Sequence, residues 1–213
     1  MDGQVSSDLI EKWLKAWSLS RQLPLPVHYK SGLMVDVREE KQSKRYVFPT
    51  CNDDFFELAQ TINEPWIFLK VCASFEEFKD KIPERWVLQP QGYMMYCSSP
   101  MEFADKNLPD KYRFEYKQYE STFLVNIMEN NVVASSGRIV FVDDLAVYDR
   151  IFTEKDHRRK GLASFLMKEL EKIALSKGFF NNFLVATEQG KKLYELLGWK
   201  LYSLYTSIVI ERE

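Results

Sequence analysis

Hydrophobic residues recur along the chain at two spacings, and each spacing predicts one kind of element. Apolar side chains three and four positions apart predict amphipathic helices at residues 8–20, 53–63, 74–82, 162–176 and 188–197. Alternating or continuous apolar runs predict strands at residues 32–37, 44–49, 66–73, 86–96, 112–116, 122–128, 132–142, 145–153, 183–186 and 200–210. The second half therefore has four strands, a helix, a strand, a helix and a last strand.

These elements predict an α+β fold (α/β-like) in two parts. Prolines and serines in residues 98–109 predict a linker, which divides an N-terminal region, 1–105, from a more regular domain, 106–213. The strand-helix-strand order of residues 66–96 occurs again at 183–210, so a degenerate duplication stays open. In the first helix, Trp13 and Trp17 share one face; packing in the core is favoured over lining a ligand cleft.

Composition indicates a globular protein and excludes several classes. Apolar residues make up 46 % and charged residues 28 %, and the net charge of -2 gives no global attraction to nucleic acid or an anionic membrane. Cysteines at 51, 72 and 97 and two histidines provide no metal-ligand spacing. The first seven residues are not typical of a signal peptide, and no apolar run is long enough to cross a membrane. We expect a cytoplasmic protein without metal, nucleic acid or membrane partners.

A basic loop joins the strand at 145–153 to the long helix at 162–176. It consists of Arg158, Arg159, Lys160, Gly161, Leu162 and Ala163. The first turn of a helix has free N–H groups and a positive dipole end, and glycine lets the backbone approach an anion closely, so the loop suits a pyrophosphate. Two other interpretations remain: Gly161 is only a helix cap beside a solvated basic run, or the loop contacts nucleic acid.

The pattern R-x-x-G-x-A in this loop resembles motif A of the GNAT superfamily of N-acetyltransferases. Downstream, Tyr194 precedes Gly198 and Trp199 as in the Tyr-x-x-x-Gly-aromatic element of that family. The resemblance covers roughly residues 110–210. It implies a GNAT fold, with a central mixed, mostly antiparallel sheet flanked by helices. The N-terminal region is then either a degenerate GNAT-like half or an extension that completes the acceptor site.

The resemblance also implies a cofactor site and a catalytic acid. The strands at 145–153 and 183–186 should splay apart and admit acetyl-CoA, with main-chain groups of Ile151, Phe152 and Thr153 bonding the pantetheine arm. Residues 158–163 would hold the pyrophosphate, and Thr187 stands where the family often has a cofactor-binding asparagine. Tyr194 would be the general acid that protonates the leaving thiolate.

One departure concerns the general base. Val147 stands where many family members have a glutamate, and Asp149 lies two residues on, on the same strand face. Asp149 is either the base, directly or through water, or the ion-pair partner of a residue such as Arg138 or Arg150.

Two functions follow from these residues. The first is an N-acetyltransferase that moves an acetyl group to a primary amine of a small molecule or peptide by direct attack in a ternary complex. The alternative is a catalytically degenerate acetyl-CoA-binding sensor or interaction module. A homodimer formed through the strand at 200–210 is a further hypothesis.

Overall fold

The computed structural model describes residues 5–212; residues 1–4 and 213 lie outside the described part, and with them some of the polar start of the chain. The described α-helices are α1 (Ser7–Arg21), α2 (Asp53–Thr61), α3 (Leu162–Ser176) and α4 (Glu188–Leu196). The strands are β1 (Val27–Tyr29), β2 (Gly32–Glu39), β3 (Gln42–Phe48), β4 (Ile67–Val71), β5 (Val87–Leu88), β6 (Gly92–Cys97), β7 (Arg113–Tyr119), β8 (Thr122–Glu129), β9 (Val132–Val142), β10 (Leu145–Thr153), β11 (Asn181–Ala186) and β12 (Lys200–Val209). Short 3₁₀ turns are η1 (Phe75–Glu77), η2 (Lys79–Lys81) and η3 (Lys155–His157).

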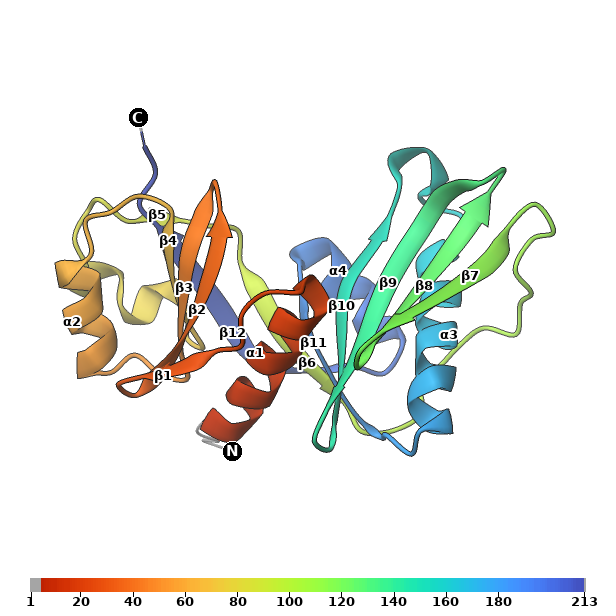
Figure 1. Cartoon of the computed structure of the whole chain (residues 1–213), viewed down its shortest axis with the longest axis horizontal. Helices are drawn as coiled ribbons and strands as arrows, with labels where there is room; N and C mark the ends of the chain where they lie inside the picture. Colours follow the sequence, from red (N-terminus) through yellow and green to blue (C-terminus); the bar gives the residue numbers. More distant parts are fainter. Residues whose placement is uncertain (1–4, 213) are drawn as a thin grey trace.

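The strands form one continuous sheet of two similar halves (Figure 1). Its order is β1-β2-β3-β4-β12-β6-β11-β10-β9-β8-β7, and β5 pairs with β12 beside this path. Two neighbouring pairs are parallel, β3 with β4 and β10 with β11, and the other pairs are antiparallel. Each parallel pair is joined through a helix, α2 in the first half and α3 in the second. The structure confirms the predicted mixed, mostly antiparallel sheet flanked by helices.

The two halves exchange one strand each at the centre of the sheet. β6 comes from the first half of the chain but pairs with β11 of the second half. β12, the last strand, pairs with β4 of the first half, and β6 and β12 pair with each other. Strand pairing therefore crosses the division at residues 105 and 106, and a separation into two independent domains stays a prediction. In the first half, β4 leads through short turns to β6, and in the second half β11 leads through α4 to β12. The two segments have equivalent places in their halves of the sheet.

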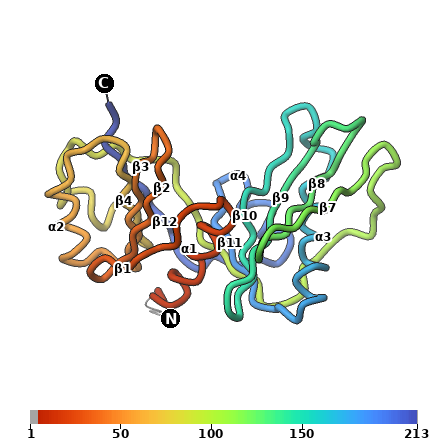
Figure 2. Tube along the Cα trace, in the orientation of Figure 1, coloured from red at the N-terminus to blue at the C-terminus, as the bar shows by residue number. Residues whose placement is uncertain are grey.

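Alternate residues of the strands separate the core into layers on the two faces of the sheet. The trace in Figure 2 shows α1 between the two halves. Val140 and Val147 face α1, together with Val47 of the first half, in one cluster that spans both halves. Their neighbours Ile139 and Tyr148 face the opposite side, where α3 and α4 lie. Trp13 and Trp17 of α1 are 2 % and 6 % exposed, which confirms that they pack in the core. α1 therefore covers the junction of the halves on one face, and α3 lies on the other.

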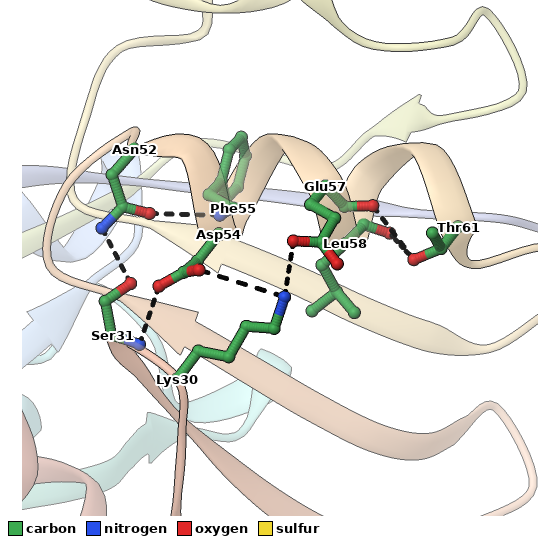
Figure 3. A network of polar contacts seen from close by, with 8 residues as sticks. All are labelled: Lys30, Ser31, Asn52, Asp54, Phe55, Glu57, Leu58 and Thr61. Atoms are coloured by element: carbon green, nitrogen blue, oxygen red, sulfur yellow. Dashed lines mark hydrogen bonds and ion pairs between the residues drawn. The ribbon is translucent and has the colours of Figure 1, made fainter.

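Polar contacts fasten α2 to the turn between β1 and β2 (Figure 3). Asn52 caps the first turn of α2 through its side-chain oxygen and donates from its amide nitrogen to the Ser31 hydroxyl at 2.8 Å. The Asp54 carboxylate accepts from the Ser31 main-chain N–H at 3.1 Å, and Lys30 pairs with Glu57 at 2.6 Å. These bonds hold the helix against the outer strands of the first half.

Two predicted elements of the first half are wrong. The predicted helix at 74–82 is two 3₁₀ turns, although Ser74 and Glu77 form the expected capping box. Phe78 leaves helical geometry because its ring is buried against Phe55 and Phe75, at centroid distances of 5.2 and 5.3 Å. The predicted strand at 86–96 is divided into β5 and β6 around Pro90, which has no N–H for the ladder. Strand β1 had not been predicted, whereas all eight elements of the second half are confirmed.

The exchange of β6 and β12 predicts that both halves unfold together. Leu69 and Leu166 are fully buried in the cores of the first and second half. We expect Leu69→Ala and Leu166→Ala each to lower the free energy of unfolding by about 2–5 kcal/mol, within a single urea transition followed by tryptophan fluorescence and circular dichroism.

Leu196→Ala is the control, because Leu196 is 77 % exposed and its truncation should change stability by no more than about 0.5 kcal/mol. Two transitions, of which each variant shifts only one, would contradict a shared core and support independent domains.

Candidate functional site

The parallel pair β10–β11 comes apart near the middle of the sheet. Residues Leu145 to Tyr148 of β10 pair with Asn181 to Leu184 of β11. Beyond these residues β10 continues to Thr153 and β11 to Ala186, but the two strands no longer pair with each other. A bulge in β10 accompanies this separation: its register with β9 shifts between Asp149 and Phe152, and Arg150 has a positive φ of 50°. The edge of β10 at residues 151–153 therefore has no β11 partner, and its bonding to a pantetheine arm stays a prediction.

A cleft of about 680 Å³ lies at this opening, on the side of the sheet that carries α3 and α4. Its lining combines the free end of β10, the basic loop, the first turn of α3 and one side of α4. The lining residues are Ile151, Phe152, Thr153, Lys155, His157, Arg158, Arg159, Gly161, Leu162, Ala163, Ser164, Thr187, Gln189, Gly190, Leu193 and Tyr194. The cleft brings together all the predicted cofactor-binding residues except Lys160, and no carboxylate is among these described lining residues.

The basic loop presents backbone N–H groups to the cleft. Gly161 begins α3 with φ +75° and has no side-chain cap, so the N–H groups of Leu162 and Ala163 have no carbonyl partner within the helix. Arg158 donates from Nε to the Thr153 carbonyl at 3.1 Å, which fixes its guanidinium beside the unpaired strand end. Gly161 is thus a helix cap and also lines the cleft, so the two interpretations of this residue are compatible.

Lys160 lies on the other side of the loop. Its ammonium donates to the Asp156 carbonyl at 2.7 Å, and its side chain lines an adjacent hollow with Lys106 and Lys168. Its predicted part in cofactor binding stays a prediction.

His157 is held at the edge of the cleft by two partners. Its Nδ1 lies 3.2 Å from Glu129 and 3.3 Å from the Tyr112 hydroxyl. Both partners come from the start and the end of the β7–β8 hairpin, so the ring is fixed against the sheet. His157 therefore lines the cleft from a fixed position.

Tyr194 and Thr187 enter the cleft from α4. Thr187 caps the helix, its hydroxyl accepting from the Gly190 N–H at 3.2 Å. Tyr194 is 7 % exposed and packs against Trp199, and a Cβ at position 190 would come within 3.2 Å of its ring. Glycine at 190 therefore makes room for the tyrosine. Burial, with a smaller contribution from the carboxylate of Asp149, raises the pKa of Tyr194 above its ordinary value.

Asp149 faces α1, on the side of the sheet opposite to α3. Its Oδ2 accepts from the Arg21 guanidinium at 2.5 Å and from the Ser20 hydroxyl at 2.6 Å. Both donors lie at the end of α1, a helix about 130 positions away in the chain. An ion pair was the alternative role expected for Asp149, with Arg138 and Arg150 as examples of the partner. The ion pair is present, but its partner is Arg21, and Arg138 donates to the Ser20 carbonyl instead. No sequence pattern points to Arg21, because only tertiary packing brings α1 to this strand.

Six lining residues were not among the predicted site residues: Lys155, His157, Ser164, Gln189, Gly190 and Leu193. Ser164 directly follows the predicted loop and Gln189 lies two residues after Thr187, so an extension of each motif by one helical turn finds both. Lys155 lies in η3, which no periodicity marks.

Comparison with protein families agrees with this geometry. The model of the "Acetyltransferase (GNAT) family" matches residues 91–199, about half of the chain, and the match includes β6 as well as the cleft. The chain belongs to the GNAT acetyltransferase family. No curated protein matches it.

Solved structures of the family show the same fold over the whole chain. A GCN5-related N-acetyltransferase from Kribbella flavida is similar with a TM-score of 0.67 and 12 % identity, over 100 % of this chain and 98 % of that chain. A putative GNAT-family acetyltransferase from Novosphingobium aromaticivorans has a TM-score of 0.60 and 12 % identity, over 95 % and 97 % of the two chains. At these identities the likeness shows the fold alone, and it includes the N-terminal half.

Among residues 5–212, no helix has the length and apolar character that a membrane span requires. Within the same range, no three side chains of His, Cys, Asp or Glu form a group able to hold a metal ion.

The cleft predicts a specific effect of a side chain at position 161. A Cβ there would meet only Phe165 at 3.9 Å, but φ of +75° is unfavourable for a β-branched residue, so Gly161→Val must distort the loop at the N–H groups of α3. We expect acetyl-CoA affinity, measured by calorimetry, to fall by roughly 10-fold or more.

Gly178→Val is the matched control, because Gly178 follows the other end of α3 with φ +78° and no atom within 4 Å of an added Cβ. Both variants should lose similar stability, but only Gly161→Val should lose affinity. Equal affinity of the two variants would remove the loop from the binding site.

Proposed function

We propose that the protein is an acetyl-CoA-dependent N-acetyltransferase that acts on a primary amine of a small molecule or peptide. The observation that carries the proposal is the coincidence of three features in one cleft: the unpaired end of β10, the free N–H groups of α3 and the buried phenol of Tyr194. Membership of the GNAT family supports the same activity. Attack would be direct, in a ternary complex.

The lining of the cleft supports binding of both the pyrophosphate and the pantetheine arm of acetyl-CoA. The first turn of α3, with Arg158 and Arg159 beside it, suits a pyrophosphate, because N–H groups and guanidinium groups both bind phosphate oxygens. The free edge of β10 at residues 151–153 offers main-chain groups to an extended chain that contains amides. The Thr187 hydroxyl accepts from the Gly190 N–H to cap α4, and its own O–H would donate one hydrogen bond to the co-substrate.

Acetyl-CoA supplies the activated acetyl group as a thioester. The main chain at the bulge of β10 would donate a hydrogen bond to the carbonyl oxygen as negative charge develops there. Asp149, on the α1 side of the same strand, would take the proton of the attacking amine, directly or through water. Tyr194, on the α4 side, would donate its proton to the departing sulfur.

A binding module without catalysis is the second candidate. Val147 takes the place of the glutamate base, and the Asp149 carboxylate is already engaged by Arg21 and Ser20. Release of free CoA in the presence of a mixed amine panel tests the choice. Tight acetyl-CoA binding with no release above the hydrolysis rate would favour the sensor.

The cytoplasmic location and the homodimer stay predictions. The interface suggested by the sequence is not compatible with the fold, because β12 lies inside the sheet between β4 and β6, and β1 and β7 form its edges.

Tyr194→Phe tests the general acid. It keeps the ring and removes the hydroxyl, so acetyl-CoA affinity should stay nearly constant while kcat falls by roughly 10² to 10⁴. Because the pKa of Tyr194 is raised, the phenol keeps its proton as pH rises, and the parent enzyme should not lose kcat through this group in the neutral to mildly alkaline range. If Tyr194→Phe turned over as fast as the parent with chemistry rate-limiting, water would be the proton source.

Asp149→Asn tests the general base. The variant should lower the rate near neutral pH by roughly 10² to 10⁴, and the deficit should shrink as pH rises, because a larger fraction of the amine is then already neutral. Asp143→Asn, in the exposed turn before the same strand, is the control and should behave as the parent. A deficit that is independent of pH would assign Asp149 to holding Arg21 in place.

A further inference from the structure

The face of the sheet that carries α1 contains a second group of functional side chains. Asp149 bonds to the end of α1 on this face, whereas the cleft and Tyr194 lie on the other, and the β10–β11 ladder ends next to Asp149. A cofactor bound on the α3 side leaves the α1 side as the route for a second substrate. The residues around the end of α1 therefore decide which acceptor can approach.

Two guanidinium groups stack on the ring of Trp17 near the end of α1. The Arg21 Cζ lies 4.4 Å from the centroid of the Trp17 ring, and the Arg45 Cζ, from β3 of the other half, lies 3.7 Å from it. Trp17 is 6 % exposed, so both stacked contacts lie at the edge of the core. The ring thus brings an arginine of the first half to the same site as the ion pair of Arg21 and Asp149.

Positive charge exceeds negative charge here. Asp149 is bonded to Arg21. Arg45 has no carboxylate within 4 Å in the described part of the chain, and its polar partner is the Gln42 side chain. Lys70, 7 % exposed, has only the neutral Ser207 hydroxyl at 2.6 Å. A buried or half-buried cation without a counter-charge is costly, and proteins keep such groups mainly where a ligand supplies the missing charge.

The perturbed titration of these groups has the same cause. Burial, with a smaller contribution from the charge of Arg21, lowers the pKa of Arg45 to about 10. Burial, together with the charges of Arg45 and Arg21, lowers the pKa of Lys70 well below its ordinary value. An anion among these side chains would relieve both effects.

A hydroxyl without a partner marks the same site. Tyr205 of β12 is 4 % exposed, and its buried OH has no hydrogen-bond partner among the described residues. Its ring lies 5.5 Å from the Lys70 ammonium and packs edge-on against Trp13 at 5.2 Å. Buried hydroxyl groups are usually bonded, so this donor is open to an acceptor atom.

We propose that the acceptor amine carries a carboxylate, as an α-amino acid does, and that Arg45 binds this carboxylate with help from the Tyr205 hydroxyl. The inference rests on the proposed acetyltransferase function and adds the substrate class. The amine end would lie toward Asp149 and the opening in the sheet, and the anionic end toward Arg45 and Lys70. The N-terminal half then contributes the specificity of the acceptor site, while the C-terminal half holds the acetyl donor.

Matched amines with and without the carboxylate test the proposal on the full-length protein. Glycine and phenylalanine are compared with glycinamide and phenylalaninamide by CoA release at saturating acetyl-CoA. We expect at least one acid to have a kcat/KM roughly 10-fold or more above its amide, which is the size of effect of a charge-assisted hydrogen bond. Amides that react as well as the acids would overturn the inference and leave the acetyltransferase function intact.

Arg45→Gln should raise KM for the acid roughly 10- to 100-fold and leave the kinetics of the amide and the KM for acetyl-CoA unchanged. Arg45→Lys, which keeps the charge, should recover part of this loss. Lys44→Gln is the control, because Lys44 is the exposed neighbour on the opposite face of β3 and its loss changes net charge equally. Equal effects of Arg45→Gln and Lys44→Gln would show that only the overall positive charge matters. This result would overturn the assignment of the carboxylate to Arg45.

If no amine causes release of CoA, a binding measurement still tests the proposed carboxylate site. The CoA complex is titrated calorimetrically with N-acetylphenylalanine and its amide. Tighter binding of the acid that is lost in Arg45→Gln supports the site even when the acetyltransferase function fails. Equal binding, or binding of neither compound, overturns it.

Discussion

The early end of the β10–β11 ladder is the constraint on which the site depends. Two parallel strands that stop pairing after Tyr148 and Leu184 leave main-chain groups without partners on a strand edge inside a sheet. The bulge at Arg150 turns that edge outward, and α3 begins beside it with free N–H groups. A ligand with amides and phosphates would satisfy these groups, so backbone geometry would account for most of the proposed cofactor site. Side chains such as Arg158 add charge at its rim.

The exchange of β6 and β12 makes the N-terminal half part of the same sheet as the cleft. Because each half completes the sheet of the other, β3 and β4 are held in fixed relation to the opening between β10 and β11. The single helix α1 covers this junction and carries Trp17 and Arg21 to it. The first half is built like the second, with a helix joining two parallel strands, but it has no glycine-led basic loop before α2. Its contribution lies instead on the α1 face, in the side chains of β3 and β4.

The two faces of the sheet differ in how they hold charge. On the α3 side, the basic residues Arg158 and Arg159 are exposed at a cleft, so solvent can screen their charges when no anion is bound. On the α1 side, Arg45 and Lys70 are packed under aromatic rings, where a missing counter-ion costs more. The first arrangement suits a large polyanion that is bound and released as a whole. The second suits the selection of one small anionic group.

The sequence by itself determined the second half of the fold and most of the residues that line the cleft proposed for the acetyl donor. Residues 145–176 show a strand, a glycine-led basic loop and a long amphipathic helix in local order, and local spacing is enough to predict a helix start that faces an anion. Only the tertiary structure decided the partner of Asp149, the exchange of β6 and β12, and the meeting of Arg45 with Trp17. These contacts join residues far apart in the chain, and each depends on which face of a strand meets which helix. Hydrophobic periodicity predicts which residues lie on one face of an element, but the pairing of strands decides what that face contacts.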